Sequence, residues 1–263
     1  RDLGYTSKIN HYNDIGIPLN IALVTTHEPG EFWSCLYESF DKVSCQKKIQ
    51  LSIHSVKYLK SFIEKLKFLS HDNNGIILMV PDLNNDQYSQ IKRKLGTFPI
   101  VSIAPSNQPL FHTVTFDSYM GGKLAAKNLI ASGYTVFGHI AGPLSKPEAN
   151  LRRAGFIDEI KKNNFDLKFE FEGDHSYESG RQAFKSLNIN NFKNLGIFSS
   201  NDQMAMGFLS SAIEQNKFLL KSWGIIGYDN TPSSKIFHPK LSSIDTDLDQ
   251  LASLSLEKLT TLI

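Results

Sequence analysis

Short apolar runs alternate with helical patterns from one end of the chain to the other. Eight runs rich in β-branched and aromatic residues predict strands at Ile21–Thr25, Ile49–Ile53, Gly75–Val80, Phe98–Ile103, Thr113–Phe116, Thr135–Ile140, Leu195–Phe198 and Gly224–Gly227. Between the first two runs, Phe32, Leu36, Phe40 and Val43 recur at helical spacing and form one apolar stripe. Nearly continuous apolar strands with intervening helices are typical of parallel sheets covered on both faces. The pattern therefore predicts an α/β fold.

The middle of the chain favours two successive open sheets over one closed barrel. Directly after the run that ends at Phe116, Asp117 is a good N-cap for a long helix, and the alternation then restarts with its own strand. Near the end, a strand-like stretch at 241–246 precedes a last helix. The predicted buried stripe of this helix is Leu248, Leu251, Ala252, Ser255, Leu259 and Leu262. No Pro/Ser-rich linker separates the halves, so we expect two lobes joined by short hinge segments.

The composition is that of an ordinary globular protein. The chain has 263 residues, of which 41% are apolar and 21% charged, and its net charge of +2 is too small to indicate nucleic-acid binding by this piece itself. No apolar run approaches the ~18 residues that a membrane-spanning helix requires. Cys35 and Cys45 fall on one predicted helix, too far apart to pair, and are expected to be reduced thiols of a cytoplasmic protein.

The common enzyme motifs are missing. The sequence contains no G-x-S-x-G, no H-E-x-x-H and no complete phosphate-binding loop. Gly121-Gly122-Lys123 lacks the earlier glycine of such a loop, so these small residues are expected to pack a helix against its strand. The eight histidines are scattered without metal-ligand spacing. We therefore expect a protein that is not an enzyme and that holds no cofactor and no metal.

Polar residues at predicted strand ends point to a ligand site. Asn201 follows the Leu195–Phe198 run and Asp229 follows the Gly224–Gly227 run. In open α/β sheets, ligands bind in the crevice beyond the carboxyl ends of the strands. Arg152 and Arg153 are adjacent on a predicted helix and cannot face the same way, so one of them can point into the crevice. Its guanidinium could hold vicinal hydroxyls or a carboxylate.

These residue types suit a neutral, hydroxyl-rich ligand, to which Phe116 could offer an apolar face. Structural alternatives remain open for each of them. Both arginines could lie on the surface, and Asp229 could be an N-cap or belong to a salt bridge. Asn201 could cap the following helix. Phe116 could pack in a core.

Several motifs resemble one family of regulators. They are Ala141-Gly142-Pro143-Leu144-Ser145, Leu151-Arg152-Arg153-Ala154-Gly155-Phe156, Glu172-Gly173-Asp174, Ser179-Gly180, Asn201-Asp202-Gln203-Met204-Ala205-Met206-Gly207 and Gly227-Tyr228-Asp229-Asn230. In order and spacing they are similar to the lactose-repressor/galactose-repressor family of bacterial transcription regulators. This resemblance covers almost the entire chain. It implies a periplasmic-binding-protein-like (type I) fold of two lobes, each a parallel sheet flanked by helices, with the ligand cleft between them.

The resemblance also implies boundaries for the parts of the chain. Residues 1–18 resemble the remnant of a DNA-binding head and hinge. Residues 19–116 with 249–263 are expected to form the N-terminal lobe, and residues 117–248 the C-terminal lobe. The core is expected to form a homodimer.

The resemblance assigns a ligand-binding role to six residues. Arg152, Asn201 and Asp229 fall on the family's sugar-contact positions, and Phe116 falls on an aromatic wall position. His175 stands where relatives have a bulky aromatic residue, and Thr26 matches a polar contact of the N-terminal lobe.

Three positions depart from galactoside-binding members. Ala104 replaces a sugar-contacting carboxylate, and Thr246 and Leu248 replace a longer amide and an aromatic residue. The identity of the sugar is therefore left open.

The expected function is the effector-binding and dimerisation core of a DNA-binding transcription regulator. Its effector would be a mono- or disaccharide, and it would meet operator DNA through a head domain absent from this chain, with no membrane partner. The alternative is a secreted sugar-binding protein of an ABC transporter, and an α/β enzyme is a third, less supported reading. A helix-turn-helix encoded upstream of Arg1 would favour the regulator, and an upstream secretion signal the alternative.

Overall fold

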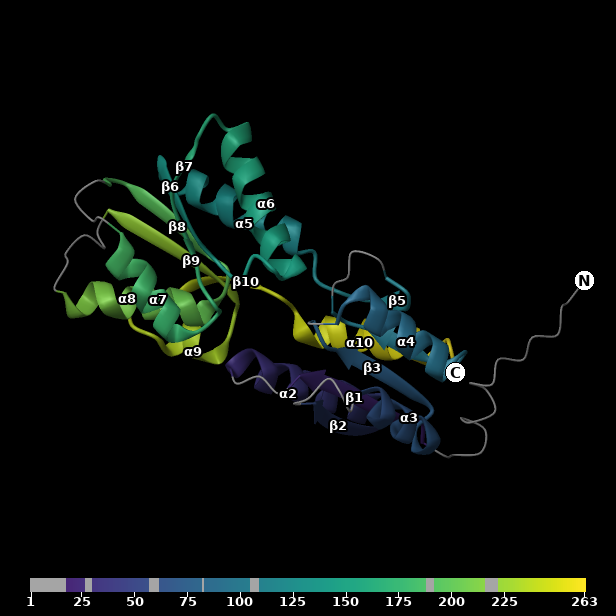
Figure 1. The fold of residues 1–263 in the computed structure, drawn as a ribbon. Coiled ribbons are helices and arrows are strands. Elements are labelled where there is room, and N and C mark those ends of the chain that lie inside the picture. The colour runs from purple at the N-terminus through teal and green to yellow at the C-terminus, as the bar shows by residue number, and fades with distance from the viewer. Residues whose placement is uncertain are drawn as a thin grey trace, which may run out of the picture. The chain divides into compact units, whose positions relative to one another are not determined.

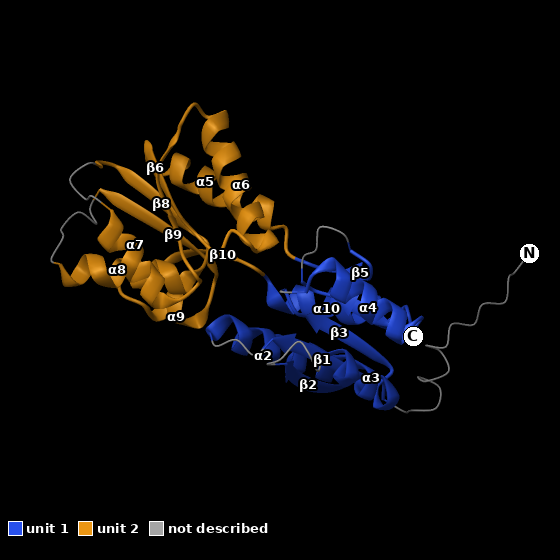
Figure 2. Cartoon of the chain, viewed as in Figure 1, with its two compact units in different colours: residues 1–115, 247–263 blue, residues 116–246 orange. Residues whose placement is uncertain are grey.

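The computed structural model divides into two compact units, which are coloured separately in Figure 2. One unit comprises residues 1–115 and 247–263, and the other comprises residues 116–246. The structure describes residues 18–26, 30–56, 62–81, 83–104, 109–187, 192–215 and 222–263. The expected head and hinge remnant at 1–18 therefore lies outside the described residues, except for Pro18.

The first unit is a five-stranded parallel sheet in the order β2-β1-β3-β4-β5 (Figure 1). Its strands are β1 (Asn20–Thr26), β2 (Gln50–Val56), β3 (Gly75–Met79), β4 (Ile100–Ser102) and β5 (His112–Thr113), and its helices are α2 (Glu31–Gln46), α3 (Phe62–Asp72), α4 (Asn85–Leu95) and α10 (Leu248–Thr260). Helices α3 and α4 share one buried apolar cluster with the sheet. Helices α2 and α10 pack against each other, and α10 also contacts β3 and β4.

The second unit is also a five-stranded parallel sheet, in the order β10-β9-β8-β6-β7. Its strands are β6 (Val136–Ala141), β7 (Leu167–Glu172), β8 (Leu195–Ser199), β9 (Trp223–Asp229) and β10 (Ser242–Asp245), and its helices are α5 (Ser118–Ala131), α6 (Pro147–Lys162), α7 (Tyr177–Ser186), α8 (Asp202–Glu214) and the short α9 (Pro232–Ile236). One buried cluster joins the sheet to α5 and α6, and another joins it to α7 and α8. The predicted α/β fold with two parallel sheets is confirmed.

Two strand predictions need correction. The predicted strand Thr113–Phe116 is wrong in position, because β5 contains only His112 and Thr113 and lies at the sheet edge. Phe116 therefore lies beyond the strand. The edge strand β7 was not predicted, because only alternate residues of Leu167–Glu172 are apolar, whereas the predicted strands are nearly continuous apolar runs.

The buried positions predicted for helices α10 and α2 are nearly all correct. In α10 the structure buries Leu256 along with most of the predicted positions, whereas Leu248 and Leu262 are only half-buried. Leu248 is the first residue of the helix and Leu262 lies beyond its end. In α2, Trp33 is buried and Phe32 is half-buried.

Glycines bring two pairs of helices in the second unit into direct backbone contact. A Cβ on Gly122 of α5 would lie 2.0 Å from the Arg152 carbonyl oxygen of α6, and a Cβ on Gly155 would lie 1.9 Å from the Tyr119 carbonyl oxygen. In the same way, Gly180 and Gly207 allow direct backbone contact between α7 and α8. Gly121 faces the Tyr228 ring of β9, so the predicted packing of this glycine segment against a strand is confirmed. The backbone of Arg152 is thereby fixed against α5.

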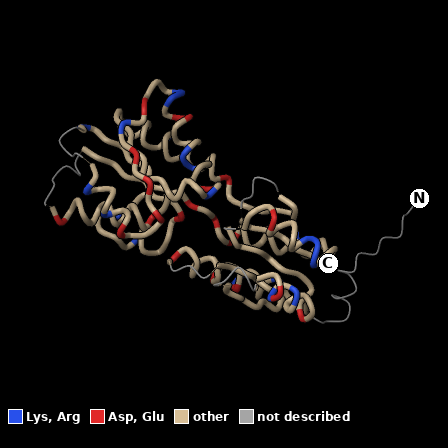
Figure 3. The backbone as a smooth tube through the Cα atoms, in the orientation of Figure 1, with Lys and Arg blue, Asp and Glu red and all other residues tan. Residues whose placement is uncertain are grey.

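Some features concern only the described part of the chain. None of its helices has both the length and the apolar character needed to cross a membrane. Cys35 and Cys45 both lie on α2 and form no disulfide within the described residues. Lys and Arg are interspersed with Asp and Glu over both units (Figure 3), consistent with the net charge of +2.

Candidate ligand site

The candidate site lies at the carboxyl ends of the strands in the second unit. Strands β6, β8 and β9 are neighbours and parallel, so the segments that follow them emerge at one edge of the sheet. From β6 the chain goes to β7 on one side and later returns to β8 on the other. This reversal of strand order is a topological switch point, where doubly wound sheets bind their ligands.

Arg152 is held at this edge by two contacts. Its side chain is only 7% exposed, and Nη1 donates a hydrogen bond of 2.6 Å to the carbonyl oxygen of Ser200, directly after β8. The guanidinium carbon lies 3.8 Å from the centroid of the Tyr228 ring, a close cation–π contact. The buried Nε makes no hydrogen bond with the described residues. Arg152 is thus fixed in place while its buried Nε–H lacks an acceptor within the described residues.

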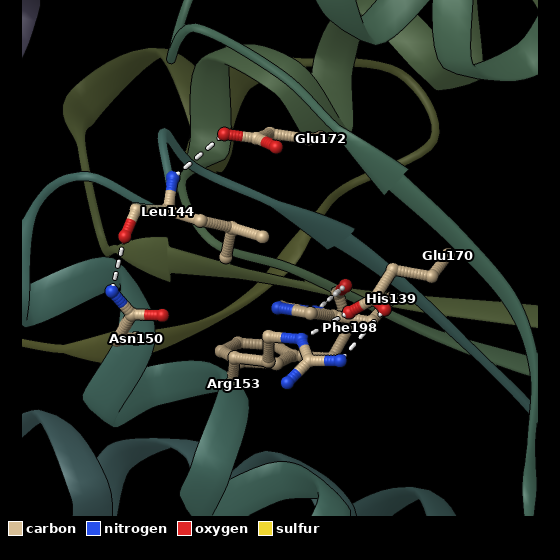
Figure 4. A network of polar contacts seen from close by, with 7 residues as sticks. All are labelled: His139, Leu144, Asn150, Arg153, Glu170, Glu172 and Phe198. Carbon is tan, nitrogen blue, oxygen red and sulfur yellow. Dashed lines mark hydrogen bonds and ion pairs between the residues drawn. The ribbon is translucent and has the colours of Figure 1, made fainter.

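Arg153 points elsewhere. Its Nε and Nη2 donate to the two carboxylate oxygens of Glu170 on β7, at 2.5 and 2.9 Å (Figure 4). The hydrogen bond to Arg153 holds the pKa of Glu170 below its usual range. The sequence alternative that places both arginines on the surface is therefore wrong for Arg152.

The loop between β6 and α6 is also fixed by hydrogen bonds. The Leu144 N–H donates to Glu172 Oε1 at 2.8 Å, and the Asn150 side-chain amide donates to the Leu144 carbonyl oxygen (Figure 4). These contacts tie the start of α6 to the end of β7. They hold the turn that precedes Arg152.

Asp229 is the last residue of β9 and has an unusual backbone. Its φ is 105° and that of Asn230 is 54°, so two consecutive non-glycine residues are in the left-handed region. Such strain is found where the surrounding structure enforces it, often at functional sites. The pKa of the Asp229 carboxyl is raised to about 8, mainly by burial, with Arg152 opposing the rise and Asp202 adding to it.

Neither structural alternative for Asp229 is found. The N-cap of α9 is Thr231, and the Asp229 carboxylate makes no hydrogen bond or salt bridge within the described residues. Only its carbonyl oxygen is engaged, accepting a 3.4 Å hydrogen bond from Thr246 Oγ1. A carboxylate that lacks a partner near a fixed guanidinium can accept hydrogen bonds from a ligand.

Asn201 has the capping role that was left open. Its Oδ1 accepts from the Met204 N–H at 3.0 Å as the N-cap of α8, and its Nδ2 donates to the His175 carbonyl oxygen at 2.9 Å. The amide still has one N–H and one lone pair. Asn201 therefore connects the start of α8 to the loop that carries His175.

His175 packs tightly against the end of β6. A Cβ on Gly142 would lie 2.0 Å from His175 Nε2, so only glycine leaves room for this ring. Nε2 is buried and makes no hydrogen bond with the described residues. Burial, together with the nearby charge of Arg152, lowers the pKa of His175 to about 3. The imidazole is therefore neutral at ordinary pH.

Two predicted residues stand apart from this group. Phe116 is half-buried in the segment between β5 and α5. Thr26 ends β1 in the first unit, and its buried Oγ1 makes no hydrogen bond within the described residues. In that unit too, β1 and β3 flank the point where the strand order reverses.

Unpartnered polar atoms define the character of the site. Within the described second unit, Arg152 Nε, His175 Nε2 and Ser200 Oγ are buried without a hydrogen-bond partner at this edge of the sheet. Burying such atoms unpaired costs ~1–3 kcal/mol each, so they mark a place where a polar ligand fits.

Sequence reasoning missed Ser200 and Tyr228, although both adjoin predicted site residues. No group of three or more His, Cys, Asp or Glu side chains suited to a metal ion occurs within the described ranges.

Comparisons with known proteins agree with this architecture. A family model of the periplasmic binding protein-like domain matches residues 126–263, in agreement with the two parallel-sheet α/β units. The chain is 30% identical over 205 residues to the HTH-type transcriptional repressor PurR of Mannheimia succiniciproducens, covering 76% of this chain and 60% of that protein. It is 25% identical over 234 residues to the lactose operon repressor of Escherichia coli K12, covering 89% and 64%.

The solved structures share the fold. A dimeric Lac repressor with an 11-residue C-terminal deletion superimposes with a TM-score of 0.83 at 24% identity, covering 93% of this chain and 90% of that one. The Lac repressor dimer bound to operator and the anti-inducer ONPF gives 0.82 at 23% identity, covering 98% and 92%. The chain belongs to the lactose-repressor/galactose-repressor family. It spans between 60% and 64% of the length of the two curated relatives named above.

Proposed function

We propose that the chain is the effector-binding and dimerisation core of a bacterial transcription regulator, and that its effector is a mono- or disaccharide. The observation that carries the proposal is the set of buried, unpartnered polar atoms on Arg152, Ser200 and His175 at the strand ends. A ligand with several hydroxyls can serve donors and acceptors at once. The ligand completes hydrogen bonds that the protein leaves open.

The charges at the site favour a neutral ligand over an anion. Arg152 offers its Nε–H, and the Asp229 carboxyl faces the same region with a pKa raised by burial. Among the described site residues, a phosphorylated ligand would meet a single fixed guanidinium, that of Arg152. A vicinal diol can instead accept from Arg152 and donate to Asp229.

The remaining predicted residues complete the site. Asn201 contributes the N–H and lone pair that capping leaves unused, and the half-buried Phe116 offers an apolar ring face to a sugar. Thr26 supplies a hydroxyl from the first unit. The two units serve as the N- and C-terminal lobes of the effector-binding core.

Regulation follows from the coupling of ligand binding to lobe arrangement. Only a ligand with different affinities for two arrangements can shift the equilibrium between them. Operator DNA is contacted by a head segment outside the part that the structure describes, and the protein acts in the cytoplasm without enzymatic turnover. The repressor names of the relatives favour this function over a transporter's sugar-binding protein. A secretion signal upstream of Arg1 in the gene would contradict it.

Exposed apolar residues support a homodimer. In the second unit, Ile236 at the end of α9 is 84% exposed, and Ile213 on α8 and Tyr177 on α7 are also exposed. Ile236 directly precedes Phe237, which is half-buried against a small buried cluster that includes Met206. Such side chains on one group of helices are typical of a protein interface.

The test is a thermal-shift screen followed by calorimetry. The panel contains D-galactose, D-glucose, D-ribose, lactose and sucrose, with hypoxanthine, guanine and glucose 6-phosphate as controls. At least one sugar is expected to raise the melting temperature, and Arg152→Ala is expected to abolish that shift. Leu151→Ala, an exposed neighbour on the same helix, serves as the matched control. Binding of the purines or the sugar phosphate alone would refute the proposed ligand class.

A further inference from the structure

A buried carboxylate beside the candidate site contacts no proposed ligand group yet holds one of them in place. Asp202 is the first residue of α8 and is completely buried. Its Oδ2 accepts from the Thr231 N–H at 2.8 Å and from Thr231 Oγ1 at 3.1 Å. Its Oδ1 accepts from Ser243 Oγ at 2.6 Å. One side chain thus joins the start of α8 to the loop after β9 and to β10.

Ser243 extends this connection to the strained turn. Its Oγ donates to Asp202 and accepts from the Asn230 N–H at 2.9 Å. Thr246 Oγ1 donates to the Asp229 carbonyl oxygen at 3.4 Å. Hydrogen bonds to backbone groups therefore fix three consecutive residues, Asp229, Asn230 and Thr231.

The turn needs this support. Asp229 and Asn230 have φ values of 105° and 54°, conformations that cost non-glycine residues of order 1–3 kcal/mol each. A relaxed turn would move Asp229 to a more ordinary conformation, and the direction of its side chain would change. The backbone conformation therefore sets where the Asp229 carboxylate lies relative to Arg152.

The sequence leaves room for the buried carboxylate. A Cβ on Gly227 would lie 2.2 Å from Asp202 Oδ1, so only glycine at this position of β9 admits the side chain. Ser234 Oγ donates to the Thr231 carbonyl oxygen at 2.7 Å and closes the loop on its other side. The arrangement is a built network whose polar members have partners, not an isolated buried charge.

We propose that Asp202 is a positioning residue, which acts through Ser243 and Thr231 to hold the left-handed turn that directs the Asp229 carboxylate toward the Arg152 side of the site. This proposal rests on the proposed function in one respect, namely that Asp229 binds the ligand. The geometry of the turn can be tested without any ligand.

The experiment is an NMR titration of the Asp229 carboxyl in the whole chain, labelled with carbon-13 at aspartate. The wild type is expected to titrate well above the ordinary aspartate range, because the turn holds this carboxyl in a buried position. Ser243→Ala removes the hydroxyl that joins Asp202 to Asn230. The pKa of Asp229 is expected to fall by about one unit or more toward its ordinary value. The Asn230 amide is expected to exchange with solvent about tenfold faster.

Three further variants separate positioning from general destabilisation. Ser243→Thr keeps the hydroxyl and is expected to retain the wild-type titration. Ser211→Ala removes a buried hydroxyl of α8 that makes no hydrogen bond within the described residues, and it is expected to leave Asp229 unchanged. Asp202→Asn keeps the side-chain shape and is expected to shift Asp229 in the same direction as Ser243→Ala.

An unchanged Asp229 titration in folded Ser243→Ala protein would overturn the proposal, even if Asp202→Asn failed to fold. An equal shift in Ser243→Ala and Ser211→Ala would also overturn it, because the effect would then be general. Neither outcome depends on a sugar. Failure of the sugar screen would therefore refute the proposed function and leave the positioning result to be judged separately.

Discussion

Gly122→Ala tests how helix contact positions the site. The new Cβ would lie 2.0 Å from the Arg152 carbonyl oxygen and 2.9 Å from the Phe156 nitrogen, both backbone atoms of α6. Ordinary non-bonded contact requires about 3.5 Å, so α5 and α6 must separate by more than about 1 Å. Overpacking of this kind costs ~1–3 kcal/mol.

The same displacement acts on Arg152. Its 2.6 Å hydrogen bond to the Ser200 carbonyl oxygen involves a charged donor, for which a contribution of ~1.5–3 kcal/mol is typical. The two effects overlap, because a helix that moves away relieves the clash while it stretches the hydrogen bond. We expect the free energy of unfolding to fall by about 2–4 kcal/mol. Sugar affinity is expected to fall as well, because Arg152 leaves its fixed position.

The assay is urea unfolding followed by circular dichroism, together with calorimetry of the sugar identified in the screen. Leu124→Ala is the matched control, because Leu124 is exposed on the same helix and its loss is expected to change stability by no more than about 0.5 kcal/mol. Wild-type stability in Gly122→Ala would refute the close contact of α5 with α6. Reduced stability with wild-type sugar affinity would refute the link between this contact and the site.

Three other outcomes are expected. The pKa of His139 is lowered to about 4 by burial, against an ordinary 6.5, so the unfolded chain takes up a proton first as the pH falls from 6.5 to 4. His139 should therefore reduce the free energy of unfolding by about 3 kcal/mol over that range. If the free energy of unfolding of His139→Phe fell with pH as steeply as that of the wild type, this role of His139 would be refuted. Ile236→Asp should turn the proposed dimer into a monomer in light scattering, and an unchanged mass would exclude Ile236 from the interface. Asn201→Ala should cost ~1 kcal/mol in urea unfolding through the lost N-cap, whereas Asn201→Asp should keep the cap and its stability.

The fold was largely predictable because strands buried on both faces leave a strong apolar signal. The completely buried β3 and β8 are continuous apolar runs. The edge strand β7 was missed because its polar residues alternate with Leu167, Phe169 and Phe171. This alternation is itself a signal of a half-exposed strand, and a search at period two would have found it. The length of β5 could not be predicted, because an edge strand ends where its single neighbour stops pairing.

The site was predictable in its residue types and less so in their roles. Helical geometry required Arg152 and Arg153 to diverge, but only the folded positions of Ser200 and Glu170 decide which arginine turns inward. Asn201 could be named as a cap from its place before a helix. The network of Asp202 with Thr231 and Ser243 joins residues far apart in sequence, so no local pattern reveals it.

The proposed function requires that the strand-end polar groups of the second unit bind a sugar. Its most direct test is calorimetric titration of the chain and of Arg152→Ala with D-galactose, D-glucose, D-ribose, lactose and sucrose. We expect saturable binding of at least one sugar to the unaltered chain and at least a tenfold weaker affinity in Arg152→Ala, a loss of ~1.4 kcal/mol or more. The absence of heat with all five sugars, or equal affinity in both proteins, would contradict it.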